Sequence, residues 1–324
     1  MSRNTSPTCS GRSRWPRAAR ASAALLSALV LGCGSAKEDV APAATDAATQ
    51  APTTATGAAP TPPPATDGSS PAINSISVDP ADGTILVGTG PALFRIVPGA
   101  KEGERIAGTV TTPKGNGSVS GNLVLRFTGP GELLASGHPQ DGNLPENLPL
   151  IRSSDHGATW SAVDGSAEGD YHELESAGDM ILAVSVDAPD VLVSRDGGRT
   201  FEKKTPPDRP IDVVVNPKDA NQIAVSTEQG TFISNNGGDS WRPRDTTFGA
   251  RLTWPDQLYS VDRSGAVRAS KDGGQSWEER GNVGGLPSVI ASGRKAELLV
   301  GIVGGKVQRS TDGGRKWTTA ATLH

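Results

Sequence analysis

Two segments of this 324-residue chain together hold two of its four histidines, and both segments also carry carboxylates. His138 begins a polar stretch that continues to Asp141, and residues 170–173 read Asp-Tyr-His-Glu. Imidazole and carboxylate groups that lie side by side can bind a polar ligand or a metal ion. We therefore treat His138, His172 and Asp170 as candidate ligand-binding residues, with Asp141 and Glu173 close by.

A structural role for the same residues is the alternative. Tyr171 and His172 would then start a strand and satisfy backbone groups, while His138 would cap a loop. A metal bound by two histidines needs a third protein ligand, and the sequence alone does not place one. We accordingly assign no metal site and expect no cofactor.

An internal repeat predicts the strands and turns that must position these residues. Five similar segments follow one another at spacings of 41, 40, 36 and 40 residues. They read SSDHGATW from Ser153, SRDGGRTF from Ser194, SNNGGDSW from Ser234, SKDGGQSW from Ser270 and STDGGRKW from Ser310. Each segment has the composition of a tight turn between two strands, because Asp or Asn is followed by glycines.

Each residue type that recurs in the five segments has a physical role. We expect the acid or amide to bind backbone N–H groups about two residues on, as in an Asx-turn, and the second glycine to supply a positive φ. The final aromatic ring packs the turn against its neighbour. The turn residues are Asp155, Asp196, Asn236, Asp272 and Asp312, and the rings include Trp160, Trp241, Trp277 and Trp317.

These segments resemble the Asp-box, or BNR repeat, S-x-D-x-G-x-T-W. The resemblance is to bacterial Asp-box β-propellers, a group that includes sialidases, sortilin ectodomains, xyloglucanases and photosystem II assembly factors. It is strongest to small secreted propellers named glycosylhydrolase or exo-alpha-sialidase. The resemblance implies that the boxes are structural and lie opposite the ligand face. That face would carry the loops between second and third strands and the connections between blades, which include His138 and Asp170.

Around each box the sequence predicts short strands, about four in every 40 residues, as in a propeller blade. An upstream blade without a box is indicated by the apolar runs 84–87 and 92–96. Residues 72–324 then have room for an all-β, six-bladed β-propeller, with seven blades as the alternative.

Sialidase-like activity, as the resemblance implies it, needs three arginines, a tyrosine activated by a glutamate, and an aspartic acid. Tyr171 and Glu173 would alternate onto one strand face, and with Asp141 they are the catalytic candidates. The Arg-Ile-Pro signature of the family is missing, and nothing in the sequence shows that Arg126, Arg209 and Arg251 converge. We therefore lean against an enzyme and favour a binding module.

The first 32 residues carry five arginines, no acid and an apolar run from Ala21 to Gly32, which is the pattern of a secretory signal. Val30-Leu31-Gly32-Cys33 resembles a lipobox, so we expect cleavage before Cys33 and lipidation of that residue. Gly34 in place of Asp favours the outer membrane, on its periplasmic or outer face, with the cell surface included. An ordinary secretory signal with an incidental Cys33 is the alternative.

Residues 33–71 read as a tether, since 41–71 hold ten Ala, seven Thr and seven Pro. Removal of the signal leaves 26 basic against 35 acidic residues, a balance that argues against nucleic-acid binding. The sequence thus predicts a lipid-anchored extracytoplasmic module that binds or assembles an envelope protein or glycan. The alternative is a sialidase-like exo-glycoside hydrolase of cell-surface or extracellular glycans.

Overall fold

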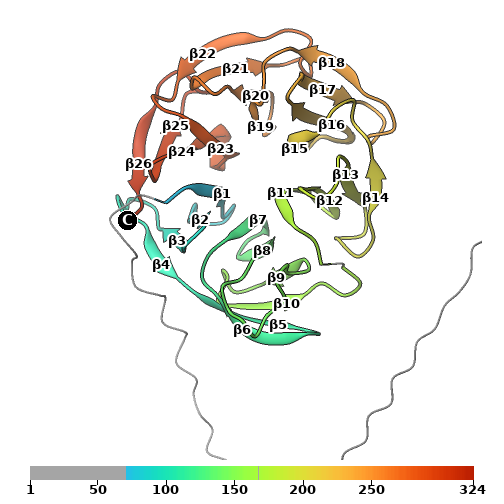
Figure 1. Ribbon diagram of the computed structural model, residues 1–324. Helices are drawn as coiled ribbons and strands as arrows, with labels where there is room; N and C mark the ends of the chain where they lie inside the picture. Colours follow the sequence, from blue (N-terminus) through green and yellow to red (C-terminus); the bar gives the residue numbers. More distant parts are fainter. Residues whose placement is uncertain (1–70, 167) are drawn as a thin grey trace, which may run out of the picture. The chain divides into compact units, whose positions relative to one another are not determined.

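A computed structural model describes residues 71–166 and 168–324. In this range six β-sheets stand around a central axis like the blades of a propeller, with β1, β7, β11, β15, β19 and β23 innermost (Figure 1). The predicted six-bladed, all-β architecture is confirmed. The expected signal peptide, Cys33 and the tether lie outside the described residues.

Five blades are four-stranded meanders in which each strand pairs antiparallel with the next. Blade 1 contains β1 (Ile73–Val78), β2 (Ile85–Thr89), β3 (Leu93–Ile96) and β4 (Glu104–Ile106). Blade 3 contains β11 (Tyr171–Ala177), β12 (Met180–Ser185), β13 (Val191–Ser194) and β14 (Glu202–Lys204). Blade 4 contains β15 (Pro210–Asn216), β16 (Asp219–Thr227), β17 (Gly230–Ser234) and β18 (Arg242–Asp245).

Blade 5 contains β19 (Arg251–Thr253), β20 (Leu258–Val261), β21 (Ala266–Ser270) and β22 (Glu278–Asn282). Blade 6 contains β23 (Pro287–Ser292), β24 (Leu298–Ile302), β25 (Lys306–Ser310) and β26 (Thr318–Thr322), with a 3-10 helix at Arg294–Ala296 between its first two strands. No helix among the described residues has the length and apolar character needed to cross a membrane.

Blade 2 is larger, with six strands in the order β6-β5-β10-β9-β8-β7. Its four blade strands are β7 (Leu123–Gly129), β8 (Glu132–Gly137), β9 (Ile151–Ser153) and β10 (Thr159–Ala162). The hairpin of β5 (Gly108–Thr112) and β6 (Gly115–Val119) adds to the outer edge, where β5 pairs parallel with β10. This hairpin therefore covers an edge that would otherwise leave its backbone groups unpaired.

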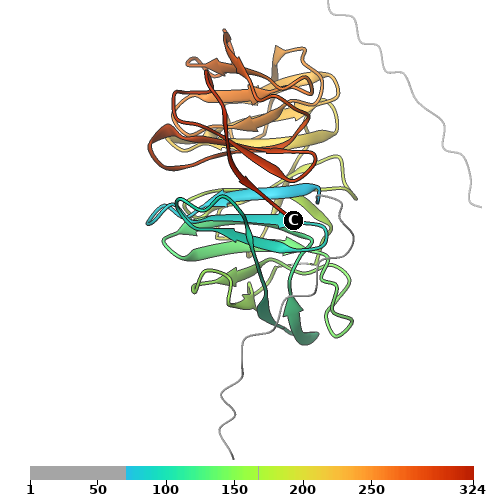
Figure 2. The same cartoon turned by 90° about the vertical axis from the view of Figure 1, so that its left-hand side faces the viewer.

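The ring closes where blade 6 meets blade 1, and the C-terminal residues contact the outer part of blade 1 there. Glu102 forms a parallel bridge with Thr322, and the Nε of Arg105 donates to the carbonyl of His324 at 3.2 Å. The side view shows the end of the chain beside the first blade (Figure 2). A core cluster spans the same junction, from Ile76 in β1 to Leu299 in β24.

All five boxes join the third and fourth strands of blades 2 to 6. In the first box Asp155 Oδ1 accepts the N–H of Thr159 at 2.8 Å and the hydroxyl of Ser153 at 2.7 Å. The expectation that the carboxylate binds an N–H two residues further along is wrong, because it binds the N–H four residues further along. The hydroxyl of Ser153 accepts the N–H groups of Asp155 and Gly157 instead. The amide of Asn236 binds Ser240 in the same way, so the third box is intact as predicted.

Candidate functional site

A central pocket of about 590 Å³ lies at the N-terminal ends of the inner strands. Inner-strand residues from every blade line it: Ile73, Asn74, Leu123, Val124, Tyr171, His172, Glu173, Pro210, Ile211, Arg251 and Ser288. Because strands alternate in direction, the loops between second and third strands lie at this end, whereas the boxes lie at the other. The pocket is therefore at the mouth of the central channel, on the face opposite the boxes.

A repeated irregularity aims side chains at this pocket. In β1, β11, β15 and β23 the register with the second strand shifts near the start of the strand, so that one residue has no partner across the ladder. These four residues all line the pocket: Asn74, His172, Ile211 and Ser288. A bulge of this kind turns a side chain away from strict alternation, and here it places an imidazole at the rim.

The bulge also overturns the expectation that Tyr171 and Glu173 lie on one strand face. Tyr171 is 5% exposed and packs in a core cluster with its ring 6.4 Å from that of Phe201, and burial raises the pKa of its hydroxyl. The carboxylate of Glu173 instead accepts from Arg251 Nη1 at 2.8 Å. An extra residue between them cancels the two-residue period on which the expectation rested.

The three candidate ligand-binding residues come together at the rim of the pocket. The Nε2 atoms of His138 and His172 lie 2.7 and 2.8 Å from the same oxygen, Oδ1 of Asp170. The two imidazole rings meet edge to face with their centroids 6.2 Å apart. His138 belongs to the long loop 138–150 between β8 and β9, and Asp170 ends the connection from β10 to β11.

Asp141 lies elsewhere in that long loop. Its carboxylate accepts the N–H of Ser118 in β6 at 2.8 Å and the N–H of Asn143 at 3.0 Å. These hydrogen bonds favour the charged form and lower the pKa of Asp141. The residue does not line the central pocket, and its contacts fasten the loop to the extra hairpin of blade 2.

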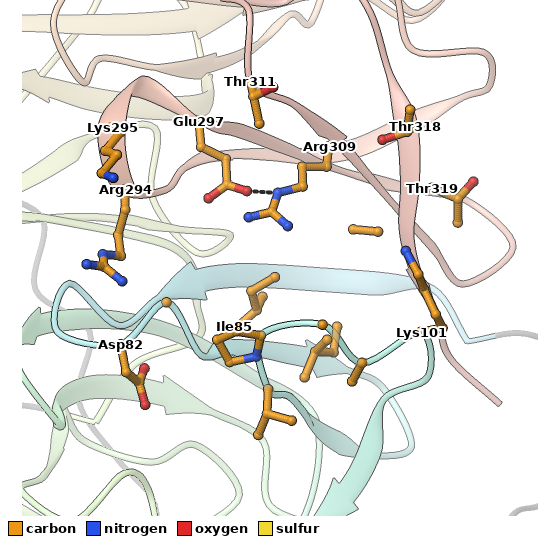
Figure 3. Close-up of a pocket in the computed structure, with 17 residues that line it drawn as sticks. Asp82, Ile85, Lys101, Arg294, Lys295, Glu297, Arg309, Thr311, Thr318 and Thr319 are labelled. Atoms are coloured by element: carbon orange, nitrogen blue, oxygen red, sulfur yellow. Dashed lines mark ion pairs between the residues drawn. The ribbon is translucent and has the colours of Figure 1, made fainter.

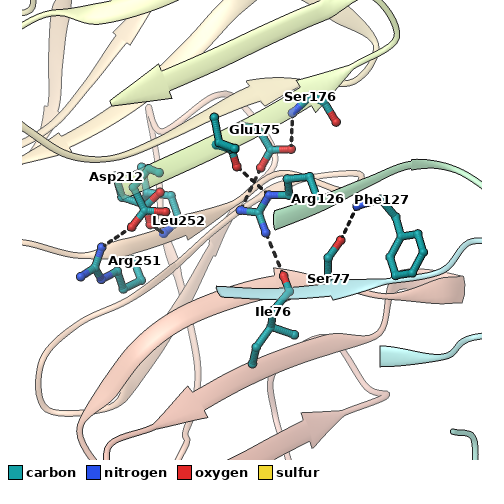
Figure 4. Close-up of polar contacts among 11 residues, drawn as sticks. Ile76, Ser77, Arg126, Phe127, Glu175, Ser176, Asp212, Arg251 and Leu252 are labelled. Atoms are coloured by element: carbon teal, nitrogen blue, oxygen red, sulfur yellow. Dashed lines mark hydrogen bonds and ion pairs between the residues drawn. The ribbon is translucent and has the colours of Figure 1, made fainter. Parts of the chain in front are cut away.

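Charged side chains from neighbouring inner strands contact one another and nearby backbone groups (Figure 4). Arg126 Nε donates to the carbonyl of Leu174 at 2.7 Å, and its Nη2 lies 3.4 Å from Glu175. Asp212 is 3% exposed and accepts the N–H of Leu252 at 2.9 Å. Sequence reasoning missed Asp212, although an acid inside the apolar run 211–215 of an inner strand is a detectable signal.

This arrangement raises the pKa of both buried acids. Burial is the main cause for Glu173, whose pKa rises to about 8 with a further contribution from the charge of Asp212 and opposition from Arg251. Burial also raises the pKa of Asp212, against the charge of Arg251 and the hydrogen bond from Leu252. The cluster has three carboxylates and two guanidinium groups, so one bound proton makes its net charge zero. Its members are Glu173, Glu175, Asp212, Arg126 and Arg251.

The three arginines considered for a carboxylate clamp bind separate protein groups. Arg126 Nη1 donates to the carbonyl of Ile76 at 2.9 Å, and Arg251 Nη1 donates to Glu173 and to the carbonyl of Ile211. Arg209 donates to the carbonyl of Val186. Each guanidinium group is thus engaged in holding inner strands and loops.

The loops around the pocket form an acidic surface, which we call the mouth face. They contain ten acids and three bases, Lys114, Arg209 and Arg263; the loops are 90–92, 113–114, 120–122, 138–150, 163–170, 186–190, 205–209, 228–229, 246–250, 262–265, 283–286 and 303–305. The opposite loops, which we call the box face, contain eleven acids and nine bases; they are 79–84, 97–103, 130–131, 154–158, 178–179, 195–201, 217–218, 235–241, 254–257, 271–277, 293–297 and 311–317. Excess negative charge is therefore concentrated on the mouth face.

Exposed apolar side chains gather on the same face. Of the five large apolar side chains that are exposed in the described residues, four belong to mouth-face loops: Val186, Phe248, Leu286 and Val303. Leu286 and Val303 are joined by a backbone hydrogen bond of 2.9 Å, and Arg263 lies over the ring of Phe248. Apolar side chains set among charges in this way are typical of a surface that contacts another molecule.

A second pocket, of about 530 Å³, lies on the box face where blades 1 and 6 meet (Figure 3). Its basic residues include Lys101, Arg294 and Lys295, and Arg309 forms an ion pair with Glu297 there. Lys295 adopts a positive φ of 53°. None of the sequence-predicted site residues lines this pocket.

Comparison with known proteins supports the fold alone. No family model and no curated protein matches the chain. It is similar to the structure of YCF48 from Cyanidioschyzon merolae, with 14% identity over 78% of this chain and 86% of that one and a TM-score of 0.44. It is similar to YCF48 bound to D1 peptide, with 16% identity over 78% and 82% of the chains and a TM-score of 0.47.

The GH74 xyloglucanase from Xanthomonas campestris is a third similar structure, with 15% identity and a TM-score of 0.49. The match covers 77% of this chain but 38% of the xyloglucanase, so the chain spans well under half of that enzyme. The six-bladed propeller is established by the sheets of this chain itself, and any more specific role rests on the site.

Proposed function

We propose that this protein is a binding module whose mouth face docks a polypeptide segment that carries basic side chains next to apolar ones. The observation that supports this is the mouth face itself, where ten acids and four exposed large apolar side chains surround the central pocket. Negative charge attracts a basic segment and speeds its encounter, while apolar contacts supply affinity once water is excluded.

A glycan partner is less well matched to this surface. Neutral sugars gain little from a surplus of carboxylates, and acidic sugars are repelled by it. The arginines that could hold an acidic sugar at the pocket, Arg209 and Arg251, already bind Val186 and Glu173. A basic and apolar peptide therefore fits the chemistry better than a glycan.

Selection from a random peptide library, with the full chain as bait, tests this proposal. We expect enriched peptides to combine Lys or Arg with Leu or Phe, and their binding to weaken as salt rises. Substitution of Asp187, Asp190 and Glu228 by amides together should reduce affinity about tenfold or more. The matched control changes Asp239 and Asp256 on the box face to Asn and should bind normally. Peptides without a charge bias, or equal losses in both variants, would refute the proposal.

Glycoside hydrolysis is the second candidate, and one observation favours it. A glutamic acid with a raised pKa at a pocket, as for Glu173, has the property needed of a general acid. A panel of aryl glycosides that includes sialosides tests this directly with the full chain. We expect no release of the aryl group; turnover that disappears in Glu173→Gln or Tyr171→Phe would make the hydrolase the correct alternative.

We propose further that the propeller is an exported, lipid-anchored member of the Asp-box propellers, held in the envelope through Cys33. Support comes from the basic and apolar leader and from Val30-Leu31-Gly32-Cys33 in the sequence. Membrane fractionation of cells that make Cys33→Ser should move the protein from the membrane to the soluble fraction. Unchanged membrane association would exclude Cys33 as the anchor.

A further inference from the structure

We propose that His138, Asp170 and His172 form a binding site for one divalent transition-metal ion such as Zn²⁺, at the rim of the central pocket. Their donor atoms lie within 4.8 Å of one another, and both Nε2 atoms already converge on one oxygen of Asp170. Two imidazoles and a carboxylate are a ligand set that such ions prefer. This inference goes beyond the proposed function, because the ion would bind with or without a partner.

The spacing of the three groups fits a metal ion after a small adjustment. Bonds of about 2.0–2.1 Å in a tetrahedral site place neighbouring ligand atoms about 3.3 Å apart. The present Nε2–Oδ1 separations are 2.7 and 2.8 Å, so each needs to widen by about half an ångström, while the ligand nitrogens of the two imidazoles, now within 4.8 Å of each other, need to adopt the same spacing. The ion would replace the hydrogen bonds that each Nε2 now shares with the carboxylate, and the imidazole protons would then reside on Nδ1.

The backbone holds both segments in place before any ion binds. Gly137 precedes His138 with φ of 148°, and a Cβ there would lie 2.1 Å from the carbonyl oxygen of Asn122. Gly169 precedes Asp170, and a Cβ there would lie 2.7 Å from the ring of Tyr171. The close packing at these two glycines fixes the backbone position of the residue that follows each of them, His138 and Asp170. A site built in advance in this way loses little entropy when it binds an ion.

The bulge in β11 supplies the third group. His172 is the residue without a partner in the ladder between β11 and β12. Its side chain therefore does not follow the regular in-and-out alternation of a strand, whereas the side chain of Tyr171 is buried. The backbone N–H of Val186 donates to the carbonyl of Asp170 at 3.2 Å and ties the bulge to the neighbouring loop. Bulges often re-aim a side chain at a site, and this one directs an imidazole toward Asp170.

The surroundings favour a cation with an open coordination position. The side chain of Asp170 is 19% exposed and that of His138 is 32% exposed, so these two ligands are partly shielded from water, whereas the side chain of His172 is 57% exposed. The excess of acids on the mouth face raises the local concentration of cations. Three protein ligands leave a fourth position of a tetrahedral ion for water or for a group from a bound molecule.

Titration of the full chain with Zn²⁺ tests the site, using protein without an oligohistidine tag that has been stripped with a chelator. Calorimetry and native mass spectrometry should show one tightly bound ion per chain. Asp170→Asn, His138→Ala and His172→Ala should each raise the Kd about 100-fold or more. The matched control is His156→Ala: His156 pairs with Asp79 at 3.1 Å on the box face without a second imidazole, so its loss should leave the Kd unchanged.

Co²⁺ substitution gives a readout that does not depend on whether a variant folds. The unaltered chain should develop the visible absorption of a four-coordinate Co²⁺ ion, and one equivalent of Zn²⁺ should abolish it. Absence of tight binding in the unaltered chain, or equal Kd values for Asp170→Asn and His156→Ala, would overturn the proposal. Peptide selection performed with a chelator present keeps the proposed docking function separate, since its outcome does not require the ion.

Discussion

The box face and the mouth face are made by the same six sheets, yet they treat their polar groups in opposite ways. On the box face the acid of each Asp-box is bound by its own turn, as Asp272 is by the N–H and the hydroxyl of Ser276. On the mouth face the loops differ from blade to blade, and carboxylates such as Asp170 bind side chains from distant segments. A repeated turn stabilises the scaffold, whereas the irregular loops are where a particular site can arise.

The pKa values follow the same division. Hydrogen bonds from the turn lower the pKa of Asp155 and Asp196 and lower that of Asp272 to about 2. Burial in the channel raises the pKa of Glu173 and Asp212 instead. The turns thus favour the charged form of the box carboxylates, whereas burial favours the protonated form of these two acids.

Replacing one aromatic side chain on each face by alanine should give the largest difference in stability between the two faces. Trp160 is 3% exposed and its Nε1 donates to the carbonyl of Gly157 at 2.8 Å, so Trp160→Ala should lower the free energy of unfolding by about 3–5 kcal/mol. Phe248 is 45% exposed, and Phe248→Ala should change it by about 0.5 kcal/mol or less. Denaturant unfolding monitored by circular dichroism measures both. Similar losses in the two variants would show that the mouth face also carries the scaffold.

The pH dependence of stability should differ in sign between channel and boxes. Since the pKa of Glu173 rises from 4.5 to about 8 on folding, the folded state binds the proton more tightly than the unfolded state. Its stabilisation is complete below pH 4.5 and is lost as pH rises toward 8, an effect of a few kcal/mol at most. Glu173→Gln should therefore flatten the decline in unfolding free energy over this range.

The matched variant for that measurement is Asp155→Asn in a box. The pKa of Asp155 is lowered on folding, so its stabilisation is present above 3.8 and is lost as pH falls below that value. Asp155→Asn should change the slope of the stability curve only in its acid limb, and Glu173→Gln should change the slope only in its neutral limb. A neutral limb that is the same with and without Glu173 would contradict the raised pKa.

The scaffold could be predicted from sequence because its signals are local. Box residues from Ser153 to Trp160 contact one another within eight positions, and the same pattern recurs four more times. The mouth loop and the segment that starts at Asp170 could be placed on one face by counting strands. Counting does not reveal the bulge at His172, because a register shift depends on how two strands pair and not on either strand alone.

The sequence singled out Asp170 as a candidate, but it did not show that this carboxylate contacts both histidines. Asp170 lies 32 residues from His138, and only the packing of the long loop against the following connection brings them to 2.7 Å. Asp212 was missed for a different reason, since an acid in an apolar strand carries no sign of the arginines that compensate it from other blades. Residues that act across blades are positioned by ring closure, which no local pattern encodes.

The smallest expected effect concerns the one box that already lacks an acid. The amide of Asn236 accepts the N–H of Ser240 at 3.0 Å and donates to its hydroxyl at 3.0 Å, so Asn236→Asp keeps the geometry by reversing one hydroxyl. Unfolding free energy at pH 7 should change by about 0.5 kcal/mol or less. Below pH 4 the variant should lose stability faster than the unaltered chain, because it gains a carboxylate whose charged form the turn stabilises. An unchanged acid limb, measured by urea unfolding between pH 2.5 and 5, would show that the box binds amide and carboxylate without distinguishing their charge.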